Sequence, residues 1–545
     1  MWVGSCQGGN NMSDNIQPIF ILPEDTRRTT GRDAQRNNIA AAKAVAQTVR
    51  TTLGPKGMDK MIVDSIGEVI VTNDGVTILE EMQIEHPAAK MVVEVAKTQE
   101  NIVGDGTTTA VVLAGELLKK AEDLLEMEIH PTVLVKGYRM AEVQAQKILK
   151  NLAQSISLEH EEMLRNIIIT AMTGKGAEAN KEVLSELILR AVKLVAAEGK
   201  INLGDIKVEI IVGEGADSSE LVQGIVLDKE RVHAAMPERI ENAKVALLDA
   251  ALEIKNTEID AKIQITDPTQ LNLFLEQEER TLREMVETIA RSGATAVFSQ
   301  RGVDDLAQHF LAKKKIFAVR RVKKSDMEKL ARATGAKIVS NWKELNLGDL
   351  GSAGVVREEK VNGEEMIFVE KCLNAKAVTL LIRGGTSHVA EEIKRAVTDA
   401  LGDTAAALKD GFVVAGAGAV EMELAKELRK YAGTLSGREQ LAVQNFAEAM
   451  EVIPRTLAEN AGLDPIDVLT QLRFAHDHGQ SGAGVNVFTG GVLDAWKEGI
   501  IEPLKIKTLA LSSAAEVAEM ILRIDDVIMG KKQEAPKAGN HGMEM

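Results

Sequence analysis

Gly104-Asp105-Gly106-Thr107-Thr108-Thr109 is the stretch that decides most about how this chain folds. Two glycines flank a carboxylate, three hydroxyl side chains follow, and residues 107–125 then carry a broad apolar stripe. Glycine lets the backbone take a positive φ and approach a ligand closely, and the N–H groups at a helix N-terminus attract an anion. The stretch therefore predicts a phosphate-binding turn at the start of a helix that is anchored in a core.

Asp105 gives this turn a negative charge that would repel a bare phosphate. Its presence favours a bridging cation, and Mg²⁺ is the ion that combines one or two carboxylates with phosphate oxygens. An ordinary structural alternative stays open, in which Thr107 caps the helix behind an Asp-Gly turn. The P-loop and the dinucleotide fingerprint are excluded, because no Gly-Lys pair and no Gly-x-Gly pair has the required spacing.

Composition excludes several classes of protein. A chain of 545 residues is expected to form about three or four domain-sized units. The net charge of −16 argues against nucleic acid as the main partner, since phosphate backbones need a basic surface. Cys6 and Cys372 are too few for a disulfide framework, and neither a signal peptide nor a bilayer-spanning apolar run is present. We therefore expect a cytoplasmic protein with no membrane partner.

The apolar pattern changes character twice along the chain. Helical periodicity dominates from 34 to 197, apart from two short strands near 61–63 and 69–72 and a break at 173–176. Strands and helices alternate from 207 to 382, which indicates an α/β unit with some parallel pairing. Residues 418–529 are again expected to be helical. This order predicts a multidomain α and α/β fold with a middle domain inserted into an outer one, and disordered tails at 1–15 and 531–545.

An unusual apolar segment lies inside the mixed part. Residues 259–265 alternate apolar and polar, and four large apolar side chains follow within five positions: Leu271, Leu273, Phe274 and Leu275. One face of a helix cannot hold all four. Either the helix is clamped between two layers, or one side is exposed as an interaction surface for another protein or another copy of this chain.

These motifs together resemble the group II chaperonins, and within them the archaeal thermosome subunits. The resemblance runs from Ile21 to Met529. The segments that carry it are GRDAQ at 31–35, TLGPKGMDKM at 52–61, TNDG at 72–75, HPA at 86–88, the turn at 104–109, LIRGG at 381–385 and NVFTG at 486–490.

The resemblance implies three domains. They are an equatorial ATP-binding domain from both chain ends (1–158 and 414–545), an intermediate hinge domain (159–228 and 379–413) and an α/β apical domain (229–378). The apical domain is expected to carry a helical lid protrusion at about 254–287, which would make the apolar cluster at 271–275 an exposed surface for unfolded clients.

The resemblance also implies the site residues. Asp105 would bind Mg²⁺, Asp74 and Asp399 would position and activate the attacking water, Lys175 would sense phosphate, and Glu502 would contact the ribose. The nucleotide contacts that it implies are Leu53, Gly54, Pro55, Gly106, Thr107, Thr108, Thr109, Lys175, Gly416, Asn486 and Glu502. ATP with Mg²⁺ is the expected cofactor set, and K⁺ is a further candidate.

The local sequence alone does not establish a catalytic role for Asp74 or Asp399. Asp74 in Asn-Asp-Gly has the composition of an ordinary turn, and Asp399 lies beside an apolar stripe like any polar-face residue of a helix. One departure from the resemblance concerns residues 415–419, which are Ala-Gly-Ala-Gly-Ala where the family usually has three consecutive glycines. A methyl group at Ala417 is expected to crowd the ligand or oppose a positive φ.

The function expected from all of this is an ATP-driven chaperone. It would assemble with itself or related subunits into a double ring of eight or nine subunits per ring, enclose unfolded proteins, and close its lid through ATP binding and hydrolysis. Two rivals are a metabolic ATP-dependent transferase or ligase, for which no acceptor motif is present, and a passive holding protein without ATP turnover.

Overall fold

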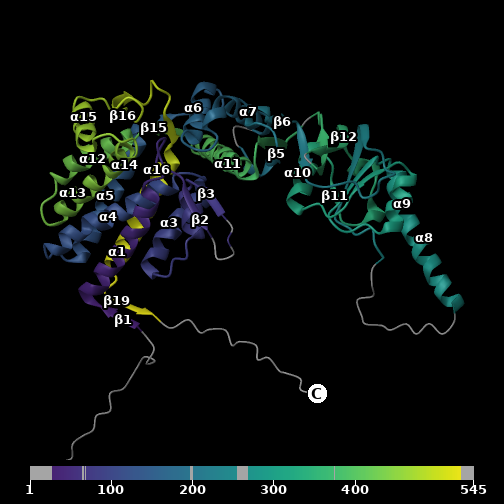
Figure 1. Cartoon of the computed structure of the whole chain (residues 1–545), viewed down its shortest axis with the longest axis horizontal. Coiled ribbons are helices and arrows are strands. Elements are labelled where there is room, and N and C mark those ends of the chain that lie inside the picture. Colours follow the sequence, from purple (N-terminus) through teal and green to yellow (C-terminus); the bar gives the residue numbers. More distant parts are fainter. Residues whose placement is uncertain are drawn as a thin grey trace, which may run out of the picture.

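The computed structural model describes residues 27–63, 67, 69–196, 201–254, 268–361, 363–373 and 375–529. The chain forms three bodies along its long axis: a helical body, a smaller mixed body beside it, and an α/β body at the far end (Figure 1). The two expected tails and the alternating segment at 259–265 lie outside the described residues, as do the side chains of Leu271, Leu273 and Phe274.

The helical body is built from both ends of the chain around one helix. Helix α4 (Thr107–Glu126) is buried along most of its length and packs against α1 (Gly31–Arg50), α3 (Pro87–Val103) and α16 (Leu504–Leu522). The other helices of this body are α5 (Pro131–Leu152), α12 (Ala419–Ala432), α13 (Glu439–Met450), α14 (Val452–Asn460) and α15 (Pro465–Asp477).

Two short strands close this body. Strand β1 (Arg27–Thr30) pairs antiparallel with β19 (Asp526–Met529), so the first and last described elements lie side by side. A single hydrophobic core joins residues 39–149 to residues 414–522. Apolar stripes on helices more than 300 residues apart in the sequence therefore bury one another.

The smaller mixed body has a core of its own. Helices α6 (Glu161–Met172), α7 (Lys181–Val195) and α11 (Ser387–Asp410) pack with a three-stranded sheet. In that sheet β14 (Val378–Gly384) lies between β5 (Ile206–Val212), which runs parallel to it, and β6 (Glu220–Val222), which runs antiparallel. Helix α11 and strand β14 bring the chain back from the α/β body.

The α/β body contains a seven-stranded sheet. Its strands follow the order β10 (Phe317–Val319), β9 (Ala296–Ser299), β8 (Arg239–Leu248), β12 (Gly351–Val361), β13 (Glu364–Glu370) and β7 (Gly224–Leu227), and β11 (Ile338–Val339) pairs with β8. The pairs among β8, β9, β10 and β11 are parallel, whereas β7, β12 and β13 pair antiparallel. The predicted parallel pairing is thus present on one side of the sheet.

The alternation of β8 shows why this sheet is covered on both faces. Val245 and Leu247 belong to the core that includes α10 (Lys324–Thr334), and Ala246 and Leu248 belong to the core that includes α8 (Pro268–Ser292) and α9 (Asp305–Lys313). Successive strand residues point to opposite faces, so an unbroken apolar run indicates burial on both.

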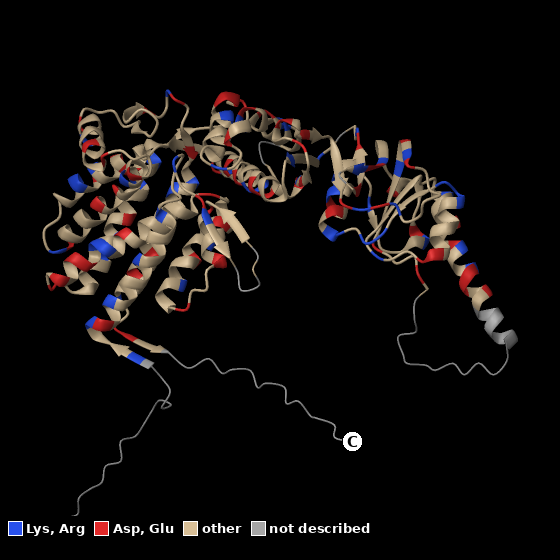
Figure 2. Ribbon diagram, viewed as in Figure 1, with Lys and Arg blue, Asp and Glu red and all other residues tan. Residues whose placement is uncertain are grey.

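Most of the predicted elements form, and one prediction is wrong. Residues 418–529 are not wholly helical, because β16 (Ala483–Asn486) and β17 (Gly491–Asp494) make a hairpin and β18 (Ile501–Pro503) pairs with β15 (Phe412–Ala415). Strands of three or four residues between glycine-rich turns are too short to show a period of two clearly. Within the described residues, no helix is long and apolar enough to cross a membrane. Acidic and basic side chains are interspersed over all three bodies (Figure 2).

Candidate active site

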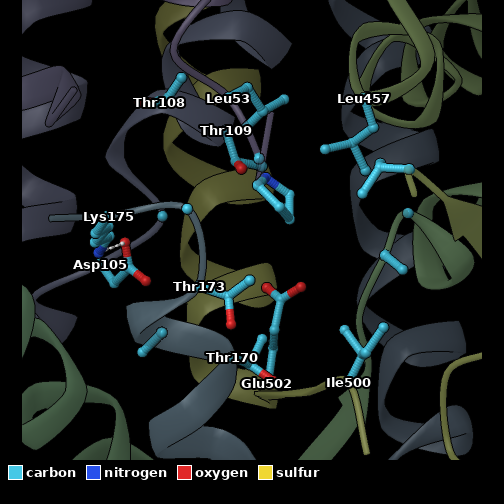
Figure 3. Close-up of a pocket in the computed structure, with 18 of the residues that line it drawn as sticks. Leu53, Asp105, Thr108, Thr109, Thr170, Thr173, Lys175, Leu457, Ile500 and Glu502 are labelled. Atoms are coloured by element: carbon cyan, nitrogen blue, oxygen red, sulfur yellow. Dashed lines mark hydrogen bonds and ion pairs between the residues drawn. The ribbon is translucent and has the colours of Figure 1, made fainter. Parts of the chain in front are cut away.

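A cavity of about 560 Å³ lies where the helical body meets the mixed body. Figure 3 shows its walls: Lys175 and Asp105 on one side, Leu457 and Ile500 on the other, and Leu53, Thr108 and Thr109 at one end. Glu502 and Thr170 lie at the opposite end. Polar groups therefore line one side and apolar side chains the other, as in sites for small ligands.

The turn at 104–109 forms the phosphate-sized part of this cavity. Gly104 and Gly106 both have positive φ, at 85° and 79°, and α4 begins directly at Thr107. The N-cap residue is Gly106 and no side chain of the described residues caps the helix, so the structure does not support the alternative in which Thr107 is a helix cap. Within the described part of the chain, the first N–H groups of α4 have no side-chain partner, which suits an anion.

Gln99 holds this turn in place from α3. Its Nε2 donates to the Asp105 carbonyl at 2.9 Å and to the Ile506 carbonyl at 3.2 Å. A methyl group at Gly106 would lie 2.6 Å from a side-chain carbon of Ile506, so glycine is required there for space as well as for its backbone angle. The turn is thus preorganised before any ligand binds.

Two loops form further parts of the cavity wall next to the turn. Gly54 has a φ of 83°, and it lies beside Leu53 and Pro55 on the cavity surface. A side chain at Gly174 would meet the Cα of Pro55 at 2.6 Å, which shows how closely the loop after α6 approaches. Asn73 donates from Nδ2 to the Gly174 carbonyl at 2.9 Å and fixes this contact.

Lys175 connects three segments at the edge of the cavity. Its Nζ lies 2.6 Å from Asp399 Oδ2 on α11 and 3.4 Å from Asp105 Oδ1. Burial alone would lower the pKa of the Lys175 ammonium, but Asp105, Asp399 and Asp403 outweigh that effect and hold the pKa well above its ordinary value. Lys175 is therefore a fixed positive charge beside the turn.

Asp74 combines a structural contact with a place on the cavity wall. It is the N-cap of α2 (Gly75–Glu81), and its Oδ2 accepts hydrogen bonds from the Thr77 backbone N–H at 2.9 Å and from the Thr77 hydroxyl at 2.6 Å. Asp74 also lines, together with Asp399, a second cavity of about 360 Å³ on the side of α3. The two nominated carboxylates thus share one pocket despite lying on separate elements.

Carboxylates outnumber cations around the cavity. Burial raises the pKa of Asp399 to about 7, against the opposing charge of Lys175, and burial also raises the pKa of Glu100 to about 8. Burial and Asp105 raise the pKa of Asp403 well above its ordinary value. A site with this many neighbouring acids has too little positive charge to balance them, so a bound cation would reduce the repulsion among the carboxylates.

The donor set fits Mg²⁺ when it is bound together with phosphate. Among the described residues no group of three or more His, Cys, Asp or Glu could hold a metal by itself. Mg²⁺ commonly takes one or two carboxylates, waters and phosphate oxygens rather than a cage of protein ligands. Asp105 beside the empty N–H groups of α4 offers that combination.

The far end of the cavity contains a buried ion triplet. Lys507 Nζ lies 2.9 Å from Glu421 Oε1 and 2.7 Å from Glu502 Oε2. Burial raises the pKa of Glu502 even though Lys507 opposes it, while Lys507 itself has a raised pKa because the two carboxylates outweigh its own burial. Glu502 is thereby held in one orientation on the cavity wall.

Ala417 adopts the backbone angle that its methyl group was expected to oppose. Its φ is 53°, and its carbonyl accepts a hydrogen bond from the Val485 N–H at 2.8 Å. A side chain at Gly484 would lie 2.7 Å from the Ala417 methyl, so the methyl lies close to the backbone of β16. The chain therefore accommodates alanine at this position in the left-handed region.

The structure places most of the predicted site residues on one surface and three beside it: Gly416, Asn486 and Asp399, which lines the second cavity instead. Gly416 and Asn486 are not among the lining residues, whereas their neighbours Ala417 and Val485 are. Asn486 instead accepts hydrogen bonds at Oδ1 from the N–H groups of residues 488 and 489 in its own turn. The predicted residues that line the main cavity are Leu53, Gly54, Pro55, Asp74, Asp105, Gly106, Thr107, Thr108, Thr109, Lys175 and Glu502.

Several lining residues were not anticipated from the sequence. They include Asn166, Thr170, Asp403, Phe488 and Lys507. One signal was available, because Asp403 follows Asp399 by four residues and so lies on the same face of a helix. Asn166 and Thr170 have the same spacing on α6, but two uncharged polar residues on one helix face do not by themselves indicate a ligand site.

The sequence of this chain is similar to those of several known proteins. A family model described as the TCP-1/cpn60 chaperonin family matches residues 45–532. A thermosome subunit of Methanopyrus kandleri is 63% identical over 518 residues, which cover 94% of this chain and 95% of that protein. A thermosome subunit beta of Methanothermobacter thermautotrophicus is 59% identical, with 98% of each chain covered. A thermosome subunit alpha of Archaeoglobus fulgidus is 57% identical, with 97% of this chain and 98% of that protein covered.

Proposed function

The chain belongs to the TCP-1/cpn60 chaperonin family, and on that premise we propose how its cavity drives the folding of client proteins. Membership makes it a subunit of an ATP-dependent group II chaperonin that hydrolyses ATP. We propose which residues bind and hydrolyse ATP, and how hydrolysis changes the conformation of the other two bodies.

The cavity is the nucleotide site. The turn at 104–109 would receive the phosphates on the N–H groups of α4 and the Thr hydroxyls, with the loop at 53–55 next to them. Glu502, oriented by Lys507, would accept hydrogen bonds from the ribose. The apolar wall that includes Leu457 and Ile500 offers a surface for the base.

The carboxylates supply the hydrolytic chemistry. Asp399 and Asp74 share a pocket and would accept hydrogen bonds from the attacking water, which orients it. Mg²⁺ held by Asp105, when bound, would neutralise charge on the phosphates. Lys175 would contribute a fixed positive charge on the same side.

A single observation carries this proposal: the ion pairs of Lys175 to both Asp105 and Asp399. They connect the turn of the helical body to α6 and α11 of the mixed body. Any change in phosphate charge at the turn acts on Lys175, and through Asp399 on α11. Since α11 leads from the strand β14, which also contacts the α/β body, this is a route from nucleotide to client surface.

We propose the corresponding assignments for the whole chain. The helical body would be the equatorial domain (1–158 and 414–545), the mixed body the intermediate domain (159–228 and 379–413) and the α/β body the apical domain (229–378). Helix α8 would belong to the lid at about 254–287, and Leu275, which is 54% exposed, would belong to its client surface.

The assembly is also part of the proposal. This chain would form a cytoplasmic double ring with eight or nine subunits in each ring, and relatives named as alpha and beta thermosome subunits support its assembly with related chains as well as with itself. ATP and Mg²⁺ would be its cofactors, with K⁺ a further candidate. The alternative of a holding protein without turnover gains no support from the backbone at Ala417, which takes a φ of 53° despite its methyl group.

Nucleotide binding to the assembled chain tests this site. Calorimetric titration with ADP and Mg²⁺ should show tight binding in the native chain and a large loss of affinity in Asp105→Ala. Glu427→Ala, at a half-buried acid that does not line the cavity, is the matched control and should bind like the native chain. Equal binding by all three chains would contradict the assignment of this cavity.

A further inference from the structure

Asp403 is a carboxylate that α11 brings to the wall of the nucleotide cavity, one helical turn after Asp399, which lines the second cavity. The residue is 3% exposed, and its Oδ1 accepts no hydrogen bond from the part of the chain that the structure describes. A buried carboxylate oxygen without a donor costs free energy, so one expects a donor that arrives with the ligand.

Gly402 explains how Asp403 comes so close to the turn at 104–109. A side chain at position 402 would lie 2.9 Å from the Val103 carbonyl oxygen and 3.5 Å from the Cα of Gly104. Only glycine lets α11 pass directly against the residues that precede Asp105. The next residue of the helix, Asp403, then lines the same cavity as Asp105.

The surroundings of Asp403 restrict the donor that could serve it. Lys175 Nζ pairs with Asp399 and Asp105, and among the described residues it makes no hydrogen bond to Asp403 Oδ1. Glu502, which lines the same cavity, is paired with Lys507. A phosphate oxygen carries negative charge and no proton to donate, so it cannot be the partner.

A hydrated cation can supply the hydrogen-bond donor that Asp403 lacks. Mg²⁺ keeps several of its waters when it binds through one or two carboxylates and phosphates, and those waters are strong hydrogen-bond donors. Carboxylates that accept such bonds orient the ion and strengthen its binding.

We propose that Asp403 is a positioning residue for Mg²⁺, which accepts a hydrogen bond from a water molecule of the ion that Asp105 binds. This inference rests on the proposed nucleotide site and adds a residue to it. Asp403 would set how much free Mg²⁺ the site requires, and it would do so without touching the nucleotide.

The test is the Mg²⁺ dependence of ADP binding to the full-length assembly, measured by calorimetry at a series of free Mg²⁺ concentrations. Asp403→Asn keeps the shape of the side chain and removes its charge. It should raise the Mg²⁺ concentration at half-maximal binding by about tenfold, with ADP binding restored at saturating Mg²⁺. Thr404→Val is the matched control, because Thr404 is the next residue, equally buried, and its hydroxyl bonds only the Ala400 carbonyl of its own helix among the described residues.

A second variant separates positioning from general damage. In an Asp105→Asn chain, Asp403→Asn should cause no further rise in the Mg²⁺ requirement, since both act through one ion. An unchanged Mg²⁺ requirement in Asp403→Asn, or an independent and additive effect in the Asp105→Asn chain, would overturn the proposal. A native chain that binds no ADP at any Mg²⁺ concentration would instead overturn the nucleotide site itself.

Discussion

Ala417 is in the left-handed region of backbone space, where an L-residue with a side chain is strained by about 1–2 kcal/mol. The hydrogen bond from the Val485 N–H to its carbonyl holds it there. We predict that Ala417→Gly raises the stability of the native chain by about 1 kcal/mol, because glycine takes this angle without strain.

Thermal unfolding of the two chains, followed by circular dichroism, measures this effect. The buried neighbour Ala415 lies in β15 and serves as control, since Ala415→Gly should lower the midpoint. A midpoint for Ala417→Gly at or below that of the native chain would show that the methyl group contributes more than the strain costs.

Glu451 is a buried carboxylate held between two arginines of the helical body. Its side chain is 2% exposed, and Arg429 and Arg473 both pair with it. Burial alone would raise the pKa of Glu451, but the hydrogen bonds from the two arginines outweigh it and lower the pKa. A carboxylate with a lowered pKa stabilises the fold above its unfolded pKa, and this stability is lost as pH falls through the folded value.

We therefore predict that Glu451→Gln destabilises the chain by about 3 kcal/mol at pH 7, and that the difference from the native chain shrinks below about pH 4. Urea unfolding at several pH values measures both. Glu427→Gln, at an exposed pair with Lys430, should change little at any pH. A deficit that stays constant down to pH 3 would mean that Glu451 acts through packing and not through its charge.

Helices α1 and α4 cross at a point where only glycine fits. A methyl group at Gly115 would lie 2.3 Å from the methyl of Ala46. We predict that Gly115→Ala destabilises the helical body by about 1–3 kcal/mol, because an added methyl in a packed core forces the helices apart. Gly433→Ala is the control, since its nearest neighbour is a carbonyl oxygen of the adjacent helix end at 3.3 Å. Equal unfolding midpoints for the two variants would contradict this account of the packing.

Long amphipathic elements were predictable from sequence and short ones were not. The apolar stripe over 107–125 predicts α4, and that over 34–51 predicts α1, because many residues share one period. The hairpin of β16 and β17 was missed, since four residues between glycine turns give no clear period. The order of strands in the large sheet depends on contacts between distant segments, and local sequence patterns do not predict those contacts.

The same distinction applies to the site. The turn at 104–109 is local, and its glycines and hydroxyls predict a phosphate site without further help. Lys175 meets Asp105 across 70 residues and Asp399 across 224, so no local spacing connects them. Those residues were nominated through the family resemblance, and Asp403 was missed because an acid on a helix face has many ordinary explanations.

At the scale of the whole molecule, the bodies differ in which parts of the sequence form them. The helical core needs residues from both ends, whereas both faces of the large sheet are covered by helices from within 224–377. We predict that a fragment of residues 223–377 folds alone, and that a chain ending at Pro503 does not form a stable helical body, because it lacks α16. Solubility and cooperative thermal unfolding of the two fragments test this. An unfolded 223–377 fragment would mean that the α/β body depends on its neighbours.

We propose that Asp399 couples ATP hydrolysis at this site to protein folding. The most direct measurement compares the native assembly with Asp399→Asn for Mg²⁺-dependent ATP turnover and for refolding of a denatured client in the same samples. We predict that turnover falls by about a hundredfold or more while ADP binding is kept, and that ATP-dependent refolding is lost with it. Undiminished turnover in Asp399→Asn, or refolding that continues without turnover, would contradict the claim.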